Sequence, residues 1–243
     1  MTGILLWLQL AAAPPPDFDA FAKAFRAACA VEAGPGNREQ KAAAIEVADC
    51  ARERMEEELD LLLVPLRTGY RDRFDALMRE QAAWNRFVEA GCALVEEMEW
   101  VDLETGEVTF GTAAGFAAAG CEEQARVERA YFAAAVRAGG TAGVQERVRT
   151  RAAEGEQTRA VIRAWRDGVS RWITTPAKTE SELFRALTAA DARRLRDAAL
   201  AVERQAGALA RPLCRNWPAL RDGFGGQEAC VRAAGGYLLG HLR

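Results

Sequence analysis

Residues 77–92 read LMREQAAWNRFVEAGC, and this stretch decides the fold class of the chain. Its stripe residues recur every three or four positions, at Leu77, Gln81, Trp84, Val88 and Cys92. That spacing is typical of one face of an α-helix. We therefore expect a long helix here, whose aromatic residues belong to a hydrophobic core rather than to a ligand-binding box.

Similar helical patterns lie on both sides of this stretch. Asp17 is expected to cap a first helix and Asn37 a second, which Pro65 should kink or end, while Thr188 and Asp191 have the spacing of a capping box. Together the patterns predict an all-α helical bundle. The expected helices cover about 18–33, 37–66, 74–92, 121–139, 141–172 and 188–209, with a last one after residue 230.

Residues 100–110 interrupt the helical period. From Trp100 to Phe110 the side chains alternate between apolar and polar around Thr105-Gly106. Alternation around such a turn is typical of a β-hairpin. We expect a small hairpin here, outside the helical frame.

The six cysteines fall into three sequential pairs, and these predict either disulfides or buried thiols. A zinc site is excluded, because no C-x-x-C motif is present and His241 is the only histidine. Buried thiols would suit a cytoplasmic protein, whereas disulfides would place the chain in an oxidising compartment. The pairs are Cys29 with Cys50, Cys92 with Cys121, and Cys214 with Cys230.

The N-terminus favours the disulfides. Residues 1–13 contain a short apolar run that ends in Ala11-Ala12-Ala13, which resembles the apolar region and cleavage site of a signal peptide. It is atypical, because no basic residue precedes the run and Pro14 follows it. The run is too short to span a bilayer, so we expect export to the bacterial periplasm or beyond without an integral membrane anchor.

The chain also suggests two related helical halves, 14–139 and 140–243. Each half has the order helix, cysteine, irregular segment, cysteine, helix. Gly115-Phe116 precedes Cys121, and Gly223-Phe224 precedes Cys230. We interpret this order as a weak internal duplication with its boundary near Gly139-Gly140.

Composition argues against several classes of function. The net charge of −3 favours neither nucleic acid nor an anionic membrane as a partner. Hydrolase elbows, Walker loops, zinc-protease motifs and dinucleotide fingerprints are missing. A nucleophile that needs a histidine would depend on His241, which we expect in a frayed tail. The sequence thus predicts a non-enzyme without a cofactor or metal.

Residues 77–92 resemble the signature of the LprI-type lysozyme-inhibitor domain, a family of small, exported, helical bacterial domains. The resemblance covers about residues 29–133. One departure is that Val88-Glu89 follows Phe87, where members often carry Arg-Asp. The second half matches only in its order of cysteines and helices. The residues that carry the resemblance are Leu77, Gln81, Trp84, Phe87 and Cys92, followed by Cys121 and Arg129.

The resemblance implies an exported binding protein, in some members an inhibitor of lysozyme. Lysozymes are commonly cationic, and residues 91–124 hold eight acids without a Lys or Arg. An acidic loop closed by Cys92 and Cys121 could attract such a partner and bury an aromatic side chain against it. The alternative is a solvated loop with its tryptophan packed on the preceding helix. The candidate partner-binding residues are Glu96, Glu97, Glu99, Trp100 and Asp102.

A second class of function is a structural or assembly protein of the cell envelope. Its contact face would be the Arg-rich helix expected at 141–172. A cell-wall lysis assay with lysozyme separates the two classes.

Overall fold

The computed structural model describes residues 17–109, 114–175, 177 and 184–242. Within these ranges the chain forms eight α-helices, a short 3-10 helix and one pair of short strands, so the all-α expectation is confirmed. The predicted signal peptide, residues 1–13, lies outside the described ranges. The elements are α1 (Phe18–Ala28), α2 (Asn37–Gly69), α3 (Arg71–Trp100), β1 (Glu107–Val108), α4 (Phe116–Arg137), α5 (Thr141–Ser170), η1 (Arg171–Ile173), β2 (Arg185–Ala186), α6 (Ala189–Asn216), α7 (Pro218–Gly223) and α8 (Gln227–Gly240).

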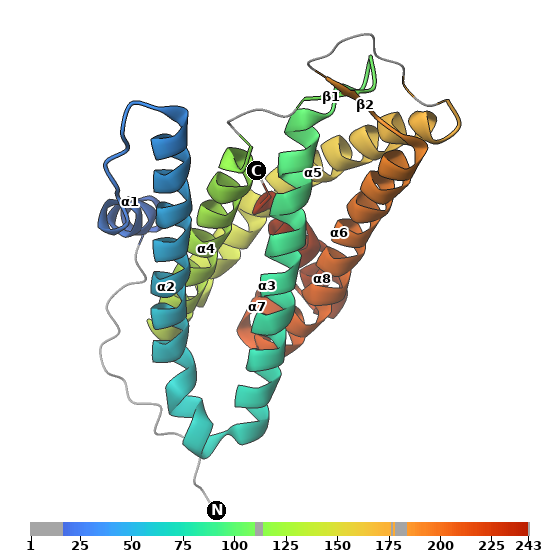
Figure 1. Ribbon diagram of the computed structural model, residues 1–243. Coiled ribbons are helices and arrows are strands. Elements are labelled where there is room, and N and C mark those ends of the chain that lie inside the picture. The colour runs from blue at the N-terminus through green and yellow to red at the C-terminus, as the bar shows by residue number, and fades with distance from the viewer. Residues whose placement is uncertain (1–16, 110–113, 176, 178–183, 243) are drawn as a thin grey trace, which may run out of the picture.

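The long helices alternate in direction along the chain. Figure 1 shows α2 and α3 as an antiparallel pair, with α4 beside them and with α5 and α6 forming a second antiparallel pair. The short α1 lies across α2, and α8 packs against both α5 and α6. This is the arrangement expected when amphipathic helices joined by short turns bury their apolar stripes together.

Local capping signals place the starts of α1 and α6. The Oδ1 atom of Asp17 accepts a hydrogen bond from the backbone N–H of Ala20 at 3.0 Å, and Thr188 and Asp191 form the predicted capping box. Asn37 proved to be the first residue of α2, with Gly36 at the N-cap, and the helix continues through Pro65. Asn37 is therefore not the cap, and Pro65 does not end the helix. The apolar spacing continues across the proline, because Leu63 and Leu66 are both buried against the core.

The helix that contains residues 77–92, α3, is longer than expected. α3 continues past Cys92 to Trp100, because Leu94, Val95 and Met98 maintain the helical spacing and pack against the core. The residues between Cys92 and Trp100 are therefore helical and do not form a loop. α4 likewise begins at Phe116, before the expected start at Gly120-Cys121.

The predicted hairpin is present and has an additional partner. Val101 and Val108 form an antiparallel bridge across a turn in which Gly106 adopts a φ of +70°. The second arm of the hairpin, β1, also pairs with β2, with Glu107 opposite Ala186, so that β1 lies between Val101 and β2. This long-range pairing ties the hairpin to the segment before α6.

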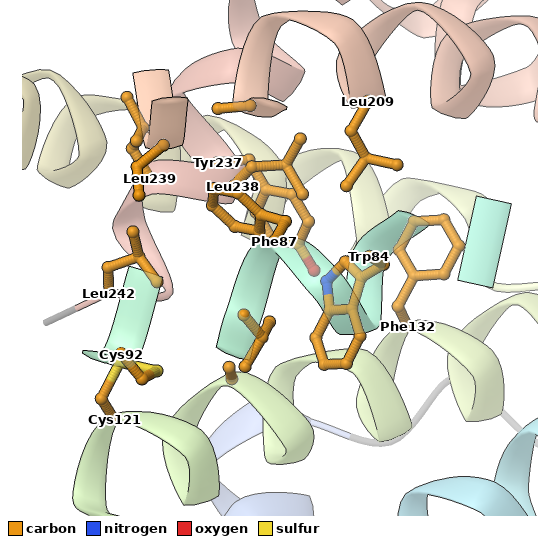
Figure 2. Packing of buried hydrophobic residues seen from close by; sticks show 14 of the residues in the cluster. Trp84, Phe87, Cys92, Cys121, Phe132, Leu209, Tyr237, Leu238, Leu239 and Leu242 are labelled. Carbon is orange, nitrogen blue, oxygen red and sulfur yellow. A yellow bond between two sulfur atoms is a disulfide. The ribbon is translucent and has the colours of Figure 1, made fainter. Parts of the chain in front are cut away.

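One hydrophobic core runs through both predicted halves. Trp84 and Phe87 of α3 are buried together with Phe132 of α4, Leu209 of α6 and Leu238 of α8. Figure 2 shows these side chains converging between the helices. The duplication itself stays a prediction, but the two segments share one interior.

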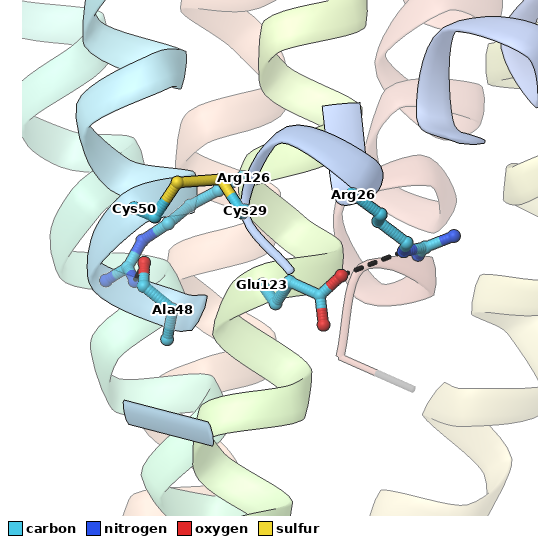
Figure 3. Close-up of a disulfide and its surroundings, with 6 residues drawn as sticks. All are labelled: Arg26, Cys29, Ala48, Cys50, Glu123 and Arg126. Carbon is cyan, nitrogen blue, oxygen red and sulfur yellow. Dashed lines mark hydrogen bonds and ion pairs between the residues drawn. A yellow bond between two sulfur atoms is a disulfide. The ribbon is translucent and has the colours of Figure 1, made fainter. Parts of the chain in front are cut away.

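All six cysteines form disulfides in the predicted sequential pairs, with no free thiol. Cys29–Cys50 ties the end of α1 to α2, and Figure 3 shows it near Arg26, whose guanidinium pairs with Glu123 of α4 at 2.8 Å. Disulfides are typical of proteins that function in an oxidising compartment outside the cytoplasm. Within the described ranges, no helix has the length and apolar character needed to cross a bilayer.

Candidate functional site

The five candidate partner-binding residues lie at the C-terminal end of α3 and in the turn that follows. Glu96, Glu97 and Glu99 are in the last helical turns, Trp100 ends the helix, and Asp102 begins the turn. They are close together, as expected, but most of them have partners inside the protein. The acidic segment is therefore a helix end with internal contacts and not a free loop.

Glu96 holds the start of α4. Its carboxylate accepts hydrogen bonds from the backbone N–H groups of Gly115 and Ala118, and from the indole N–H of Trp100 at 2.6 Å. Burial opposes ionisation, but these hydrogen bonds outweigh it and lower the pKa of Glu96. The first N–H groups of a helix have no partner within it, so this carboxylate serves as a cap supplied from another helix.

Glu97 and Asp102 also have structural partners. Glu97 pairs with Arg194 of α6, with 2.8 Å between Oε1 and Nη1. The carboxylate of Asp102 accepts hydrogen bonds from the backbone N–H groups of Glu104 and Thr105, which lower its pKa and form the hairpin turn. Trp100 is half-buried, and its indole N–H donates to Glu96 of the same helix. This is the position expected if the tryptophan packs on the preceding helix and is not free to contact a partner.

Glu99 and Asp102 are the exposed acids of this set, and Glu99 lines a groove between α3 and α5, here called the α3–α5 groove. Its volume is about 340 Å³. Val161 is 56% exposed there, whereas Ile162 and Leu242 are buried beneath it. None of the described lining residues is a Lys or Arg, so the groove combines an apolar surface with one negative charge. The lining residues are Val95, Met98, Glu99, Gln157, Thr158, Val161, Ile162 and Leu242.

The residues that carry the family resemblance are all buried and build the interface of α3 with α4. Arg129 donates to Gln81 at 2.7 Å and to Glu80 at 3.1 Å. Its guanidinium also lies over the rings of Trp84 and Phe132. Leu77 and Phe87 are 2% and 0% exposed. The motif therefore specifies an internal joint between helices and offers no surface to a partner.

Glu80 was not among the predicted residues, although it completes this joint. It also accepts a hydrogen bond from the side-chain amide of Asn216 at 2.7 Å, which extends the joint to α6. The signal was present in the sequence, because Glu80 interrupts the apolar stripe between Leu77 and Trp84. A carboxylate on an apolar stripe indicates a buried partner of opposite charge.

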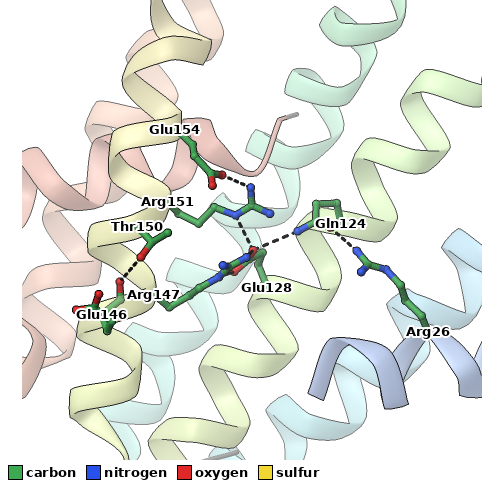
Figure 4. Close-up of polar contacts among 8 residues, drawn as sticks. All are labelled: Arg26, Gln124, Glu128, Glu146, Arg147, Thr150, Arg151 and Glu154. Atoms are coloured by element: carbon green, nitrogen blue, oxygen red, sulfur yellow. Dashed lines mark hydrogen bonds and ion pairs between the residues drawn. The ribbon is translucent and has the colours of Figure 1, made fainter. Parts of the chain in front are cut away.

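Glu128 is the second acid that sequence reasoning missed. It is completely buried and accepts hydrogen bonds from Arg147, from Arg151 at 2.7 Å and from Gln124 at 3.1 Å (Figure 4). Burial opposes its ionisation, but the hydrogen bond from Arg147 and the nearby positive charges lower its pKa. Two arginines of α5 thus neutralise one acid of α4.

His241 does not lie in a frayed tail, and that expectation was wrong. Its side chain is fully buried against the ring of Tyr237, with 4.4 Å between the ring centroids. Burial lowers its pKa to about 3. Neither ring nitrogen has a hydrogen-bond partner among the described residues. The tail is ordered because Leu242 and Leu239 are also buried in the core.

Comparison with models of protein families, with curated proteins and with solved structures found no match for this chain. In the described ranges, no cluster of three or more His, Cys, Asp or Glu side chains is arranged to hold a metal ion. Among the features at the C-terminal end of α3, the α3–α5 groove is best suited to contact another molecule, because it combines the exposed apolar side chain of Val161 with the exposed carboxylate of Glu99.

Proposed function

We propose that this protein is an exported, non-catalytic binding protein that inhibits a lysozyme or a related cationic cell-wall hydrolase. The observation that carries the proposal is the α3–α5 groove, in which exposed Val161 lies beside the negative charge of Glu99. Apolar surface supplies affinity, and the unbalanced acid favours a cationic partner. The likeness of residues 29–133 to the LprI-type domain supports the same class of partner.

The structural or assembly alternative has less support. All six arginines of α5 take part in ion pairs, among them Arg147 with Glu128 and Arg163 with Glu203. A helix whose charges are neutralised within its own chain offers little attraction to an acidic partner. We therefore place the contact surface at the groove and not on the Arg-rich helix.

The test is a cell-wall lysis assay with a purified cationic lysozyme, combined with calorimetric titration. Wild-type protein should inhibit at near-stoichiometric concentration. Val161→Asp should weaken binding at least about tenfold, because the lost burial of one valine costs about 1.5 kcal/mol or more. Val64→Asp is the matched control, since Val64 lies on α2 and is 57% exposed.

Charge is tested separately by Glu99→Lys, with Glu56→Lys on α2 as its control. Glu96 is unsuitable for this purpose, because its substitution would disturb the start of α4. The groove variant should bind more weakly at low salt, and the control should not. Absence of inhibition by wild-type protein would refute the hydrolase as partner, and equal effects of Val161→Asp and Val64→Asp would refute the groove.

A further inference from the structure

A second hollow lies between the C-terminal part of α6 and the first turns of α8. Its volume is about 670 Å³, roughly twice that of the groove. We call it the arginine hollow. It is lined by Arg211, Pro212 and Arg215 of α6, and by Gln227, Glu228, Val231 and Arg232 of α8.

The arginine hollow carries an uncompensated positive charge. Arg211, Arg215 and Arg232 are exposed, and none of them has an ion pair within the described part of the chain. Every arginine of α5, by contrast, has an acidic partner. Glu228 is the single acid in the lining, so the charges of the lining sum to +2. Like charges held together in this way repel one another unless an anion lies between them.

A disulfide holds the two walls of the hollow together. Cys214 of α6 and Cys230 of α8 are joined with 5.9 Å between their Cα atoms. Arg211 and Arg215 lie within one turn of the first cysteine, and Arg232 lies within one turn of the second. The disulfide therefore fixes the spacing of the two helix backbones that carry the arginines, which reduces the ordering that a ligand must impose.

We propose that the arginine hollow binds a phosphate or sulfate group, either as a free anion or as the terminal group of a larger molecule. Guanidinium groups donate paired N–H bonds that match the oxygens of such groups. The side-chain amide of Gln227 adds a further donor. A dianion balances the net charge of the lining. This site is on different helices from the α3–α5 groove and does not depend on the proposed inhibition.

The test is a titration of the intact, oxidised protein with inorganic phosphate at low ionic strength. Binding is measured by calorimetry and by changes in amide chemical shifts. Arg211→Gln/Arg215→Gln should weaken binding at least about tenfold, because two charge-assisted contacts are lost. Arg38→Gln/Arg193→Gln is the matched control, because it removes the same charge from exposed, unpaired arginines elsewhere in the described chain. Arg232→Gln, on the opposite helix, is an independent variant that should also weaken binding.

A second arm distinguishes the sources of the anion. Vesicles of phosphatidylglycerol are compared with vesicles of phosphatidylcholine in a co-sedimentation assay with the same variants. If inorganic phosphate binds and Arg211→Gln/Arg215→Gln weakens that binding, the ligand is a free anion. If only the anionic vesicles bind and the same variant weakens that binding, the ligand is a lipid headgroup. No binding in either arm, or equal binding by this variant and its control, would overturn the proposal.

Discussion

At the scale of the residue, His241 lies in an environment that strongly disfavours protonation of its imidazole. Its imidazole is buried with Tyr237 and Trp84, and faces Glu128 and the arginines that surround that acid. Burial dominates and lowers the pKa of the imidazole to about 3. In the unfolded chain the pKa returns to about 6.5.

This difference predicts how stability changes with pH. Between the two pKa values the unfolded chain binds the extra proton, so the free energy of unfolding falls as the pH drops below about 6.5. From about pH 7.5 to about pH 5 we expect a loss of about 2 kcal/mol in urea titrations. His241→Phe should remove most of this loss, and an equal loss in both proteins would contradict the assignment.

Glu96 shows how one side chain can be misinterpreted. An acid near the end of a helix is usually solvated, and the sequence contains no local sign that this one caps a different helix. Its two backbone partners lie 19 and 22 residues away along the chain. Only the fold brings them together.

At the scale of the element, the closest packing is that of α5 against α8. A methyl group added at Gly155 would overlap the backbone carbonyl of Gly236, and one at Gly236 would meet the carbonyl of Ala152. Gly240 is in the same position relative to Arg151. Small residues thus let the two helix backbones approach closely, which side chains of ordinary size would prevent.

We therefore predict opposite effects for two helical glycines. Gly155→Ala should lower the free energy of unfolding by about 2 kcal/mol or more, because α5 and α8 must move apart. Gly207→Ala, in the interior of α6 with open space around it, should raise stability by about 0.5–1 kcal/mol. Denaturant unfolding measures the free energy of unfolding of both variants. If Gly155→Ala and Gly207→Ala lowered it by the same amount, packing of α5 against α8 would not be the cause.

At the scale of the whole molecule, the disulfides set the conditions under which the fold persists. They close segments of 21, 29 and 16 residues. Each closure contributes about 3 kcal/mol in the chain-entropy model, so together they approach the total stability of a typical domain, which is about 5–15 kcal/mol.

Reduction should consequently lower the melting temperature markedly. The measurement is thermal unfolding followed by circular dichroism, with and without dithiothreitol, while alkylation and mass spectrometry verify that six thiols have been released. A fully reduced protein with an unchanged melting temperature would mean that the helical core alone supports the fold.

The sequence by itself determined the helical class, the starts of α1, α2, α5 and α6, the caps Asp17 and Thr188, and the sequential cysteine pairs. These features depend on contacts between residues a few positions apart, or on a periodicity that is visible in one segment. The hairpin turn at Thr105-Gly106 was predictable for the same reason. Its pairing with Arg185 and Ala186 was not, since β1 and β2 are far apart in the chain.

Only the tertiary structure decided which charged residues face inwards and which remain for a partner. Glu96, Glu128 and His241 look like ordinary polar residues in the sequence, yet each is positioned by groups from other helices. The same holds for Arg211 and Arg215, which differ from the paired arginines of α5 in forming no ion pair within the described chain. The physical reason is that burial and charge balance depend on how distant helices pack, and no local pattern records that packing.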